Sequence, residues 1–469
     1  KADRVFNKTE FSLPHPDDYK KIAHNLHTQK LGGEDGAPLN LRLVISDESS
    51  MITQDSANCI YQICRLLKAK YGLVGDPYQL PPVMTKEERR IFFESQGKED
   101  ENPDDVIYAR EMCHQFRSND VTLRLMEVRR NTGHILNYAT NVRESFGERH
   151  CLPGKAQQDD GTESGIYIAR NYEDFINNLA EAILESKTGI DVAAIAYTNR
   201  TVQRLTNDVR SILYPDTWQE QYNLGEAVLL PRQTPFAPFV TEGGLVCVDE
   251  FTTRSAFYST SHCVVKKIEI LDLDLDFGSF DYETPSKKIN KTVDFRMRGR
   301  FQRILLKHLH SSKEGYVYCP VFTDKAPKED YKKAERKIKY LMKAGVIPKP
   351  GEEGYRKHPT GKILQCMESF LPVISSANTM TIHKSQGCTL DKAYIHHDVE
   401  TCNESWRNNL LYTSLTRASS QEVIFSPCFL DEESVLPHLE NGKRLLSLPP
   451  SERKPPKLSE QEIDDLLEF

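Results

Sequence analysis

The amino-acid sequence predicts an α/β protein whose parallel sheets alternate with helices and whose second half contains a small β-rich insertion. Three observations predict this fold class. Apolar runs of strand length alternate with amphipathic segments through the first half, short β-rich runs separated by turns follow, and the α/β pattern returns after Ala377. Alternating strands and helices are typical of parallel α/β domains. A β module inserted into an α/β domain is therefore the simplest interpretation.

The predicted strands of the first half are short apolar runs. They are Leu41–Ser46, Tyr71–Gly75 and Val192–Tyr197, and the segment Phe175–Leu184 has the amphipathic pattern of a helix. Strands of a parallel sheet are covered on both faces and are nearly continuous in apolar residues. We therefore expect the run that ends at Ser46 to form a buried strand.

The predicted β module follows the first half of the chain. Its β-rich runs are Gly225–Leu230, Gly244–Asp249, His262–Leu273 and Gly315–Val321. Several short strands separated by turns predict a small barrel. The segment Lys328–Ala344 then predicts a charged helix that would form a protruding arm.

The composition restricts the classes of function. The 469 residues carry a net charge of −7, which is not the footprint of a protein that holds nucleic acid on a broad basic face. The 11 cysteines show no Cys-x-x-Cys or Cys/His ligand spacing, which favours reduced cytoplasmic thiols over disulfides or zinc. No apolar run approaches the roughly 18–20 residues that cross a bilayer, so a membrane is not an expected partner.

Two carboxylates follow the first predicted strand. Asp47 and Glu48 begin the sequence Asp-Glu-Ser-Ser-Met at its end. The carboxyl ends of parallel strands are where ligands bind in α/β proteins. In a nucleoside triphosphatase the first carboxylate would hold Mg²⁺ through water and the second would polarise the attacking water. A solvated pair of acids at a strand end is the alternative.

A glutamine follows the next predicted strand. The sequence Gly-Asp-Pro-Tyr-Gln-Leu-Pro-Pro-Val places Gln79 just beyond the strand that starts at Tyr71. The Gln79 amide can hydrogen-bond both a γ-phosphate and an attacking water, and so it can report the state of a nucleotide. Pro81 and Pro82 would stiffen the loop that carries this report to a bound strand. The alternative is an ordinary turn.

These two segments resemble motifs II and III of superfamily 1 helicases, on the 5′→3′ branch that includes RecD and the phage helicase Dda. Four further segments occur in the family's order. Leu125–Asn131 resembles the segment whose arginine touches the γ-phosphate, Ala196–Val202 resembles the start of the second motor domain, Thr381–Thr389 resembles motif V and Leu411–Ala418 resembles motif VI.

The resemblance implies roles for individual residues, with ATP as substrate and Mg²⁺ as its ion. The implied nucleotide-binding and catalytic residues are Asp47, Glu48, Gln79, Arg130, Gly387 and Arg417, with Asp47 as the metal ligand. The implied DNA-binding residues are His27, Thr28, Pro82, Thr198, Asn199, Thr381, His383, Lys384 and Ser385. A salt-bridged arginine at 130 or 417 and a core histidine at 383 are the alternatives.

The resemblance also implies two RecA-like motor domains with the barrel-like insertion in the second. The expected parts are a first domain at 1–152 with a short pin-like loop at 29–41, a second domain at 153–228 and 371–445, an insertion with a helical arm at 229–370, and a Pro-rich linker with an acidic-apolar tail at 446–469. The expected activity is that of an ATP-dependent DNA helicase or single-stranded DNA translocase moving 5′→3′. An RNA helicase and a catalytically dead nucleic-acid-binding scaffold are the alternatives. The short motor looks phage-like, so we expect it in the bacterial cytoplasm, phage-infected cells included.

The C-terminal segment predicts a docking peptide. Leu458–Phe469 alternates acids with Ile463, Leu466 and Leu467, and at helical spacing these form one short apolar stripe. A helix this short is marginal alone and would fold in a partner's groove. The segment resembles the tails of single-strand-binding proteins and sliding-clamp peptides, which implies a partner in DNA replication. A solvated tail is the alternative.

The loop that cradles nucleotide phosphates, Gly-x-x-x-x-Gly-Lys-Ser/Thr, does not occur in the chain. Lys1–Phe6 resembles the end of motif Ia and Leu26–Thr28 a later DNA-contacting motif, and in the family the loop precedes motif Ia. We therefore expect the full-length protein to carry this loop within about 60 residues upstream of Lys1. The upstream coding sequence tests this. Absence of Gly-Lys-Ser/Thr there would favour natural loss of the loop.

Overall fold

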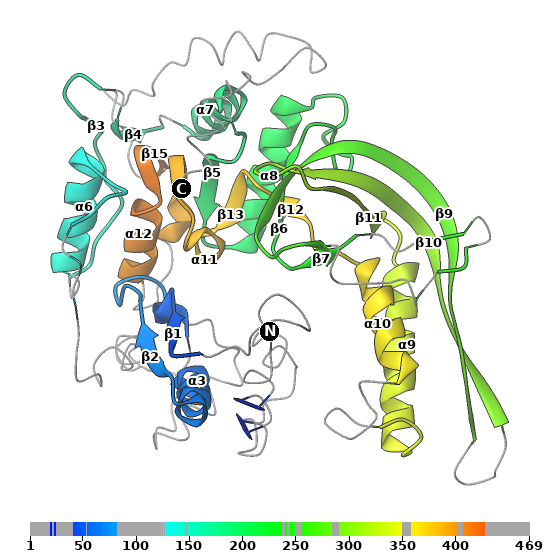
Figure 1. Ribbon diagram of the computed structural model, residues 1–469. Helices are drawn as coiled ribbons and strands as arrows, with labels where there is room; N and C mark the ends of the chain where they lie inside the picture. The colour runs from blue at the N-terminus through cyan, green and yellow to red at the C-terminus, as the bar shows by residue number, and fades with distance from the viewer. Residues whose placement is uncertain are drawn as a thin grey trace, which may run out of the picture. The chain divides into compact units, whose positions relative to one another are not determined.

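A computed structural model describes most of the chain between residues 41 and 426 (Figure 1). The described residues are 19–20, 23–24, 41–52, 54–81, 123, 125, 127–145, 148–162, 164–169, 171–186, 188–236, 240–241, 244–246, 248, 256–283, 290–348, 358–400 and 407–426. His27, Thr28, Pro82, the pin-like loop up to residue 40 and the tail Leu458–Phe469 lie outside the described residues.

The first two predicted strands are present and pair in parallel. Strand β1 (Leu43–Ser46) lies beside β2 (Lys70–Leu73), with α3 (Gln54–Leu67) between them in the chain. The prediction that the run ending at Ser46 is buried is wrong, because Leu43 and Ile45 are 53% and 58% exposed. Among the described strands β1 has β2 as its one neighbour, so its apolar side chains are incompletely covered.

A six-stranded sheet contains the other strands of the α/β pattern. Its strand order is β13-β5-β14-β15-β4-β3, and β14, β15 and β4 run parallel to one another. The strands are β3 (Gln157–Gln158), β4 (Gly165–Ile168), β5 (Val192–Ala196), β13 (Thr379–Thr381), β14 (Leu390–His396) and β15 (Ala418–Phe425). Strands β4 and β5 are buried along their whole length, as expected for a parallel sheet covered by helices.

The helices of the α/β pattern lie between its strands in the chain. They are η1 (Ser49–Met51), α6 (Gly133–Glu144), α7 (Tyr172–Glu185), α8 (Asn199–Leu213), α11 (Ile382–Ser385), η4 (His397–Val399) and α12 (Arg407–Leu415). The helix predicted over Phe175–Leu184 is thus confirmed as α7.

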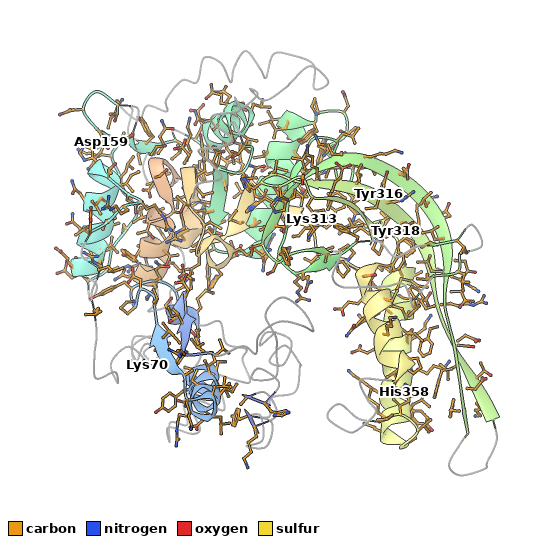
Figure 2. The ribbon with its side chains drawn as sticks, viewed as in Figure 1. Lys70, Asp159, Lys313, Tyr316, Tyr318 and His358 are labelled. Atoms are coloured by element: carbon orange, nitrogen blue, oxygen red, sulfur yellow. The ribbon has the colours of Figure 1, made fainter. Side chains whose placement is uncertain are left out.

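A residue distant in the chain caps the start of α6. The Oδ1 atom of Asp159, labelled in Figure 2, accepts a hydrogen bond of 3.0 Å from the His134 amide. Gly133 has a φ of +53°, and a Cβ there would lie 2.0 Å from the Asp159 carboxylate. Glycine is therefore required where the carboxylate approaches the helix N-terminus.

The β-rich insertion is an open sheet in the residues that the structure describes. Five strands follow the order β11-β10-β9-β6-β12, so β11 and β12 are edges and the predicted barrel is not confirmed. The strands are β6 (Ala227–Leu230), β9 (Ser261–Glu283), β10 (Asn290–His308), β11 (Glu314–Pro320) and β12 (Ser375–Ser376), and β7 (Thr234–Pro235) pairs separately with β8 (Ala256–Phe257). Strands β9 and β10 form a long antiparallel ribbon (Figure 1).

Two helices pack on this ribbon and form the core of the insertion. The predicted charged helix is α9 (Ala326–Lys343), and α10 (Pro359–Ser369) packs against it. Phe370 is fully buried. The centroid of its ring lies 5.1 Å from that of Tyr318, 5.5 Å from that of Phe277 and 6.1 Å from that of Phe301. Figure 2 shows Tyr318 on β11, two residues beyond Tyr316. Aromatic packing therefore joins α10 to the ribbon and to β11.

A ladder of ion pairs lies on the exposed face of the ribbon. The pairs are Arg296–Asp276 at 3.3 Å, Arg298–Asp274 at 3.1 Å and Arg300–Asp272 at 3.3 Å. Each pair is weak because it is exposed, but together they favour one register of the two strands.

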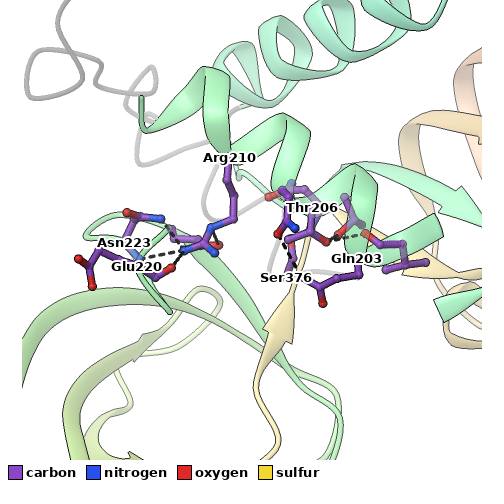
Figure 3. A network of polar contacts seen from close by, with 11 residues as sticks. Gln203, Thr206, Arg210, Glu220, Asn223 and Ser376 are labelled. Carbon is purple, nitrogen blue, oxygen red and sulfur yellow. Dashed lines mark hydrogen bonds and ion pairs between the residues drawn. The ribbon is translucent and has the colours of Figure 1, made fainter. Parts of the chain in front are cut away.

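Polar contacts hold the segment between α8 and β6, as Figure 3 shows. Arg210 Nε lies 3.2 Å from Glu226 Oε1, and Arg210 Nη2 donates to the Glu220 carbonyl at 2.7 Å. The Asn223 amide donates to Glu226 Oε2 at 2.9 Å. Burial raises the pKa of Glu226, and Arg210 opposes that shift. The ion pair with Arg210 therefore stabilises the charged form of the buried Glu226 carboxylate, which in turn accepts the hydrogen bond that holds this turn.

The chain divides into two compact units. The first comprises 1–172, 195–198 and 381–437, and the second comprises 173–194, 199–380 and 438–469. The predicted domain boundaries after residues 152, 228, 370 and 445 stay predictions.

We predict that Phe370→Ala destabilises the second unit by about 3–5 kcal/mol, because it removes the aromatic ring on which three others pack. Chemical denaturation followed by far-ultraviolet circular dichroism measures this. Phe322→Ala is the matched control, since that ring is 85% exposed and its loss should change stability by less than about 1 kcal/mol. Equal effects of the two substitutions would contradict the packing described above.

Candidate functional site

The ends of β1 and β2 are tied together by hydrogen bonds that continue beyond the strands. The Val74 amide donates to the Ser46 carbonyl at 2.9 Å, and the Ser49 amide donates to the Val74 carbonyl at 2.9 Å. The Ser49 hydroxyl donates to the Ser46 carbonyl at 2.6 Å. The loops that follow both strands, and with them Asp47, Glu48 and the segment up to Gln79, therefore start from one strand edge.

The backbone of Glu48 is in an uncommon conformation. Its φ and ψ are 49° and 42°, in the left-handed region that non-glycine residues rarely adopt. The Glu48 amide donates to Asp47 Oδ1 at 2.8 Å. Such a conformation costs roughly 1–3 kcal/mol and is often found at functional sites. Here it directs a carboxylate out of the strand end.

The carboxylate of Glu48 lies beside the segment that resembles motif V. A Cβ on Gly387 would be 3.6 Å from Glu48 Oε1, and Gly387 has a φ of +78°. Next to it, Gln386 Nε2 donates to Ser50 Oγ at 3.1 Å. The predicted residues Glu48 and Gly387, 339 positions apart in the numbering, are thus brought together.

Helix α12 holds the loop after β2. Asn409 Nδ2 donates to the carbonyl of Tyr78 at 3.0 Å and to that of Gln79 at 2.7 Å. The Tyr412 hydroxyl donates to Asp76 Oδ2 at 2.8 Å, and burial raises the pKa of Tyr412. Sequence reasoning missed Asn409 and Tyr412. Their spacing of about one helical turn, with Asn409 just before and Tyr412 within the segment that resembles motif VI, is the signal that could have indicated them.

Arg417 is fully buried among backbone oxygens. Its Nε donates to the Thr413 carbonyl at 2.9 Å and its Nη2 to Thr416 Oγ1 at 2.9 Å, while Nη1 lies 3.4 Å from the carbonyls of Ser385 and Cys388. Burial, and next the charge of a nearby arginine, lower the pKa of Arg417 to about 10. The guanidinium therefore stays charged at neutral pH.

That nearby arginine is Arg130. Its Nη1 donates to the Thr416 carbonyl at 3.3 Å, and the side chain of Asn131 donates to the Ala418 carbonyl. Two guanidinium groups thus approach the same residue, and the charge of Arg130 acts against that of Arg417, while the charge of Glu48 partly offsets it. An anion between or beside them would relieve this repulsion.

Two glutamine side chains at this site have unused hydrogen-bonding capacity. The buried Oε1 atoms of Gln79 and Gln386 have no hydrogen-bond partner among the described residues. Because the oxygen and nitrogen of an amide can exchange places, each side chain can present an acceptor or a donor. A water molecule or a phosphate oxygen is a partner of either kind.

The predicted DNA-binding residues differ in exposure. Thr198, Asn199 and Lys384 are exposed, and the Thr198 amide donates to Asp398 Oδ2 at 3.2 Å. His383 is half-buried, and burial lowers its pKa.

Two of these residues are buried. Thr381 precedes α11, and the Ser385 hydroxyl donates to the Ile382 carbonyl at 2.8 Å. The Ser385 side chain has no exposed surface, so in this conformation it supports α11 and does not offer its hydroxyl to a ligand.

The described residues contain no group of three or more His, Cys, Asp or Glu side chains that could hold a metal ion. Mg²⁺ is usually held by one or two carboxylates together with water and substrate phosphates. Asp47, exposed at the strand tip, fits that chemistry. None of the described helices is long and apolar enough to cross a membrane.

Comparison with known proteins gives distant structural likenesses. No protein-family model matches the chain, and no curated protein sequence matches it. The chain is similar to Pif1 helicase from Bacteroides in complex with ADP-AlF3 and single-stranded DNA, with a TM-score of 0.39 and 14% identity over 90% of this chain and 82% of that one. It is also similar to Pif1 helicase from Candida albicans, with a TM-score of 0.35 and 13% identity over 96% and 80% of the two chains. These neighbours are Pif1 helicases and not RecD or Dda, and similarity at this level assigns no ligand or activity.

We predict different consequences for the two arginines. Arg417→Ala should lower the free energy of unfolding by about 2–4 kcal/mol, because it leaves a cavity and unpaired carbonyl oxygens. Arg130→Ala should cost less than about 1 kcal/mol, because Arg130 is half-buried and makes one long hydrogen bond. Thermal and chemical unfolding of both variants measures this. Equal stability of the variants would show that the buried contacts of Arg417 do not support the fold.

Proposed function

We propose that the protein is an ATP-driven translocase or helicase that acts on single-stranded DNA. The observation that supports this proposal is the convergence of separate motifs in one compact unit. Residues near positions 48, 79, 130, 387 and 417 meet through the contacts described above, although up to 336 positions separate the bonded partners. The convergence joins one carboxylate, two guanidiniums and two unsatisfied amides, which is a set suited to phosphoryl transfer.

Each of these side chains has a proposed role. Glu48 accepts the proton of the water that attacks the γ-phosphate, and Gln79 orients that water. Arg130 and Arg417 neutralise the charge that develops on the transferred phosphoryl group. Asp47, together with the phosphates, would hold Mg²⁺, which would supply Lewis acidity. Because Arg417 is enclosed by carbonyls, its release toward a nucleotide requires local rearrangement of α11 and α12.

The hydrogen bonds of α12 to the loop after β2 would couple hydrolysis to movement. Gln79, which senses the γ-phosphate in this proposal, sits on a loop whose backbone is held by Asn409. If Gln79 shifts when the γ-phosphate is lost, the movement would be transmitted to α12 through this hydrogen bond. Thr198, Asn199, His383 and Lys384 would contact the phosphates of the strand, and such contacts carry no sequence information. Thr381 is buried, so it would support α11 in this proposal and make no phosphate contact.

The choice of DNA, the 5′→3′ direction and the replication partner of Leu458–Phe469 come from the resemblance to superfamily 1 helicases. ATP hydrolysis by an RNA helicase would be stimulated by RNA and not by DNA. A catalytically dead scaffold would hydrolyse no ATP with either polymer. ATP hydrolysis with single-stranded DNA and RNA in parallel separates the three functions.

We predict that Glu48→Gln lowers strand-stimulated ATP hydrolysis by the full-length protein by about 10²–10⁴-fold, because the amide cannot accept the proton of the attacking water. Nucleotide affinity should change by less than about threefold, because glutamine keeps the shape of the side chain. Phosphate release at saturating DNA and fluorescent-nucleotide binding measure the two quantities.

Glu144→Gln is the control, since Glu144 is an exposed carboxylate at the end of α6. It should hydrolyse ATP at the rate of the unsubstituted protein. Near-normal hydrolysis in Glu48→Gln would exclude Glu48 as the general base. Absence of hydrolysis in the unsubstituted full-length protein would favour the scaffold.

A further inference from the structure

Helix α9 carries a concentration of positive charge that the proposed function has not used. Residues 325–343 contain eight basic and three acidic side chains, a net charge of +5. The whole chain has a net charge of −7, so the remaining residues together carry −12. A basic segment of this size in an acidic protein calls for a physical explanation.

Six of the eight basic residues, five on α9 and Lys325 at its N-cap, form one stripe. At about 100° per residue, they fall within a sector of about 80°, centred opposite the buried face. These six are Lys325, Lys328, Lys332, Arg336, Lys339 and Lys343, and all are exposed. The buried face consists of Ala334, Ile338 and Leu341, which pack in the core with Phe277 and Met297. The fold therefore fixes the direction in which the stripe points.

Most of this charge is not neutralised within the described part of the chain. Lys339 lies 3.1 Å from Glu335, and Lys333, beside the stripe, lies 3.0 Å from Asp330. The other five members of the stripe form no ion pair with described residues. Asp330 also accepts a hydrogen bond from the Arg298 amide, so this acid is engaged by the ribbon.

We propose that this stripe, Lys325 to Lys343 on α9, is a second nucleic-acid site that binds the phosphate backbone outside the motor motifs. The inference rests on the proposed function for the identity of the polyanion. Eighteen residue steps of an α-helix span about 27 Å, a length over which one strand of a duplex presents about eight phosphates. The stripe therefore matches a nucleic-acid strand in length and in charge.

The chemistry of α9 favours nucleic acid over an anionic membrane surface. A helix that lies in a membrane inserts large apolar residues between its charged flanks. The apolar residues of α9 are enclosed in the core, and the one large ring beside the stripe is Tyr340, which is 67% exposed. An exposed tyrosine next to cations can stack on a base. The stripe thus offers phosphate contacts with one stacking position.

The test is equilibrium binding of the full chain without nucleotide, by fluorescence anisotropy, with labelled single-stranded and duplex DNA over a series of salt concentrations. The variant is the triple substitution Lys328→Gln, Lys332→Gln and Arg336→Gln. We expect at least a roughly tenfold loss of affinity at ~0.1 M salt. The slope of log K against log salt should fall by about 2.7 for a duplex or about 2.1 for a single strand, which identifies the form bound.

Two matched variants control for charge and for folding. Lys266→Gln, Lys291→Gln and Lys307→Gln remove the same charge from exposed lysines of the ribbon and should leave binding within about twofold. Lys328→Arg, Lys332→Arg and Arg336→Lys keep the charge of the stripe and should retain affinity. Equal losses in the two neutralised variants would overturn the proposal, because the effect would then be one of net charge.

Two further outcomes separate the proposals. If the stripe variant binds both DNA forms as tightly as the unsubstituted protein, the stripe is not a nucleic-acid site, while the motor function stands. If it loses DNA affinity but the unsubstituted protein shows no strand-stimulated hydrolysis, the stripe is confirmed and the motor function fails. Loss of binding only to phosphatidylserine vesicles would assign α9 to a membrane surface and overturn the proposal.

Discussion

The hydrogen bonds from α12 to the loop after β2 are the constraint on which the candidate site depends. Asn409 is almost fully buried and satisfies the carbonyl oxygens of both Tyr78 and Gln79. Buried carbonyls without partners are costly, so these bonds fix the loop relative to the helix. The same helix leads directly into Thr416 and Arg417. One element therefore positions both Gln79 and Arg417, the residues proposed to sense a phosphate and to neutralise it.

Burial and the like charge of Arg130 both act against the charge of Arg417, and the charge of Glu48 offsets part of this effect. Arg417 is buried, which costs free energy, and Arg130 adds like charge beside it. Four neighbouring oxygens keep the Arg417 guanidinium solvated by the protein, so it remains charged instead of losing its proton. A phosphate that bound between Arg130 and Arg417 would attract both guanidinium groups and so offset their mutual repulsion. In the proposed function this arrangement would favour the binding of an anion.

The sequence allowed prediction of β1, β2 and β5 and of the helices α7 and α9, because local apolar patterns carry that information. It did not allow prediction of Asn409 and Tyr412, since their importance lies in contacts with a loop more than 300 positions away. The exposure of Leu43 depends on how many strands pair with β1 and on what covers them. The local sequence of β1 carries no information on either. Strand β10, in which Asp294 and Arg296 alternate with buried Val293 and Phe295, is not among the predicted strands, so the long ribbon could not be predicted. Ser385 lies in a motif of polar residues, and only packing shows that its side chain faces inward.

A negative net charge does not by itself exclude nucleic acid as a ligand, for a physical reason. At about 0.1 M salt, charges further apart than about 10 Å are largely screened, so a bound strand is affected by nearby side chains and little by the rest of the protein. Arg130 with Arg417, and separately the α9 stripe, are local groups of cations in a chain whose remaining surface is acidic. On a chain with a negative net charge, only local groups of cations would attract the phosphates of a strand. A negative total charge is therefore compatible with nucleic-acid binding, and it makes the location of the cations more informative than their number.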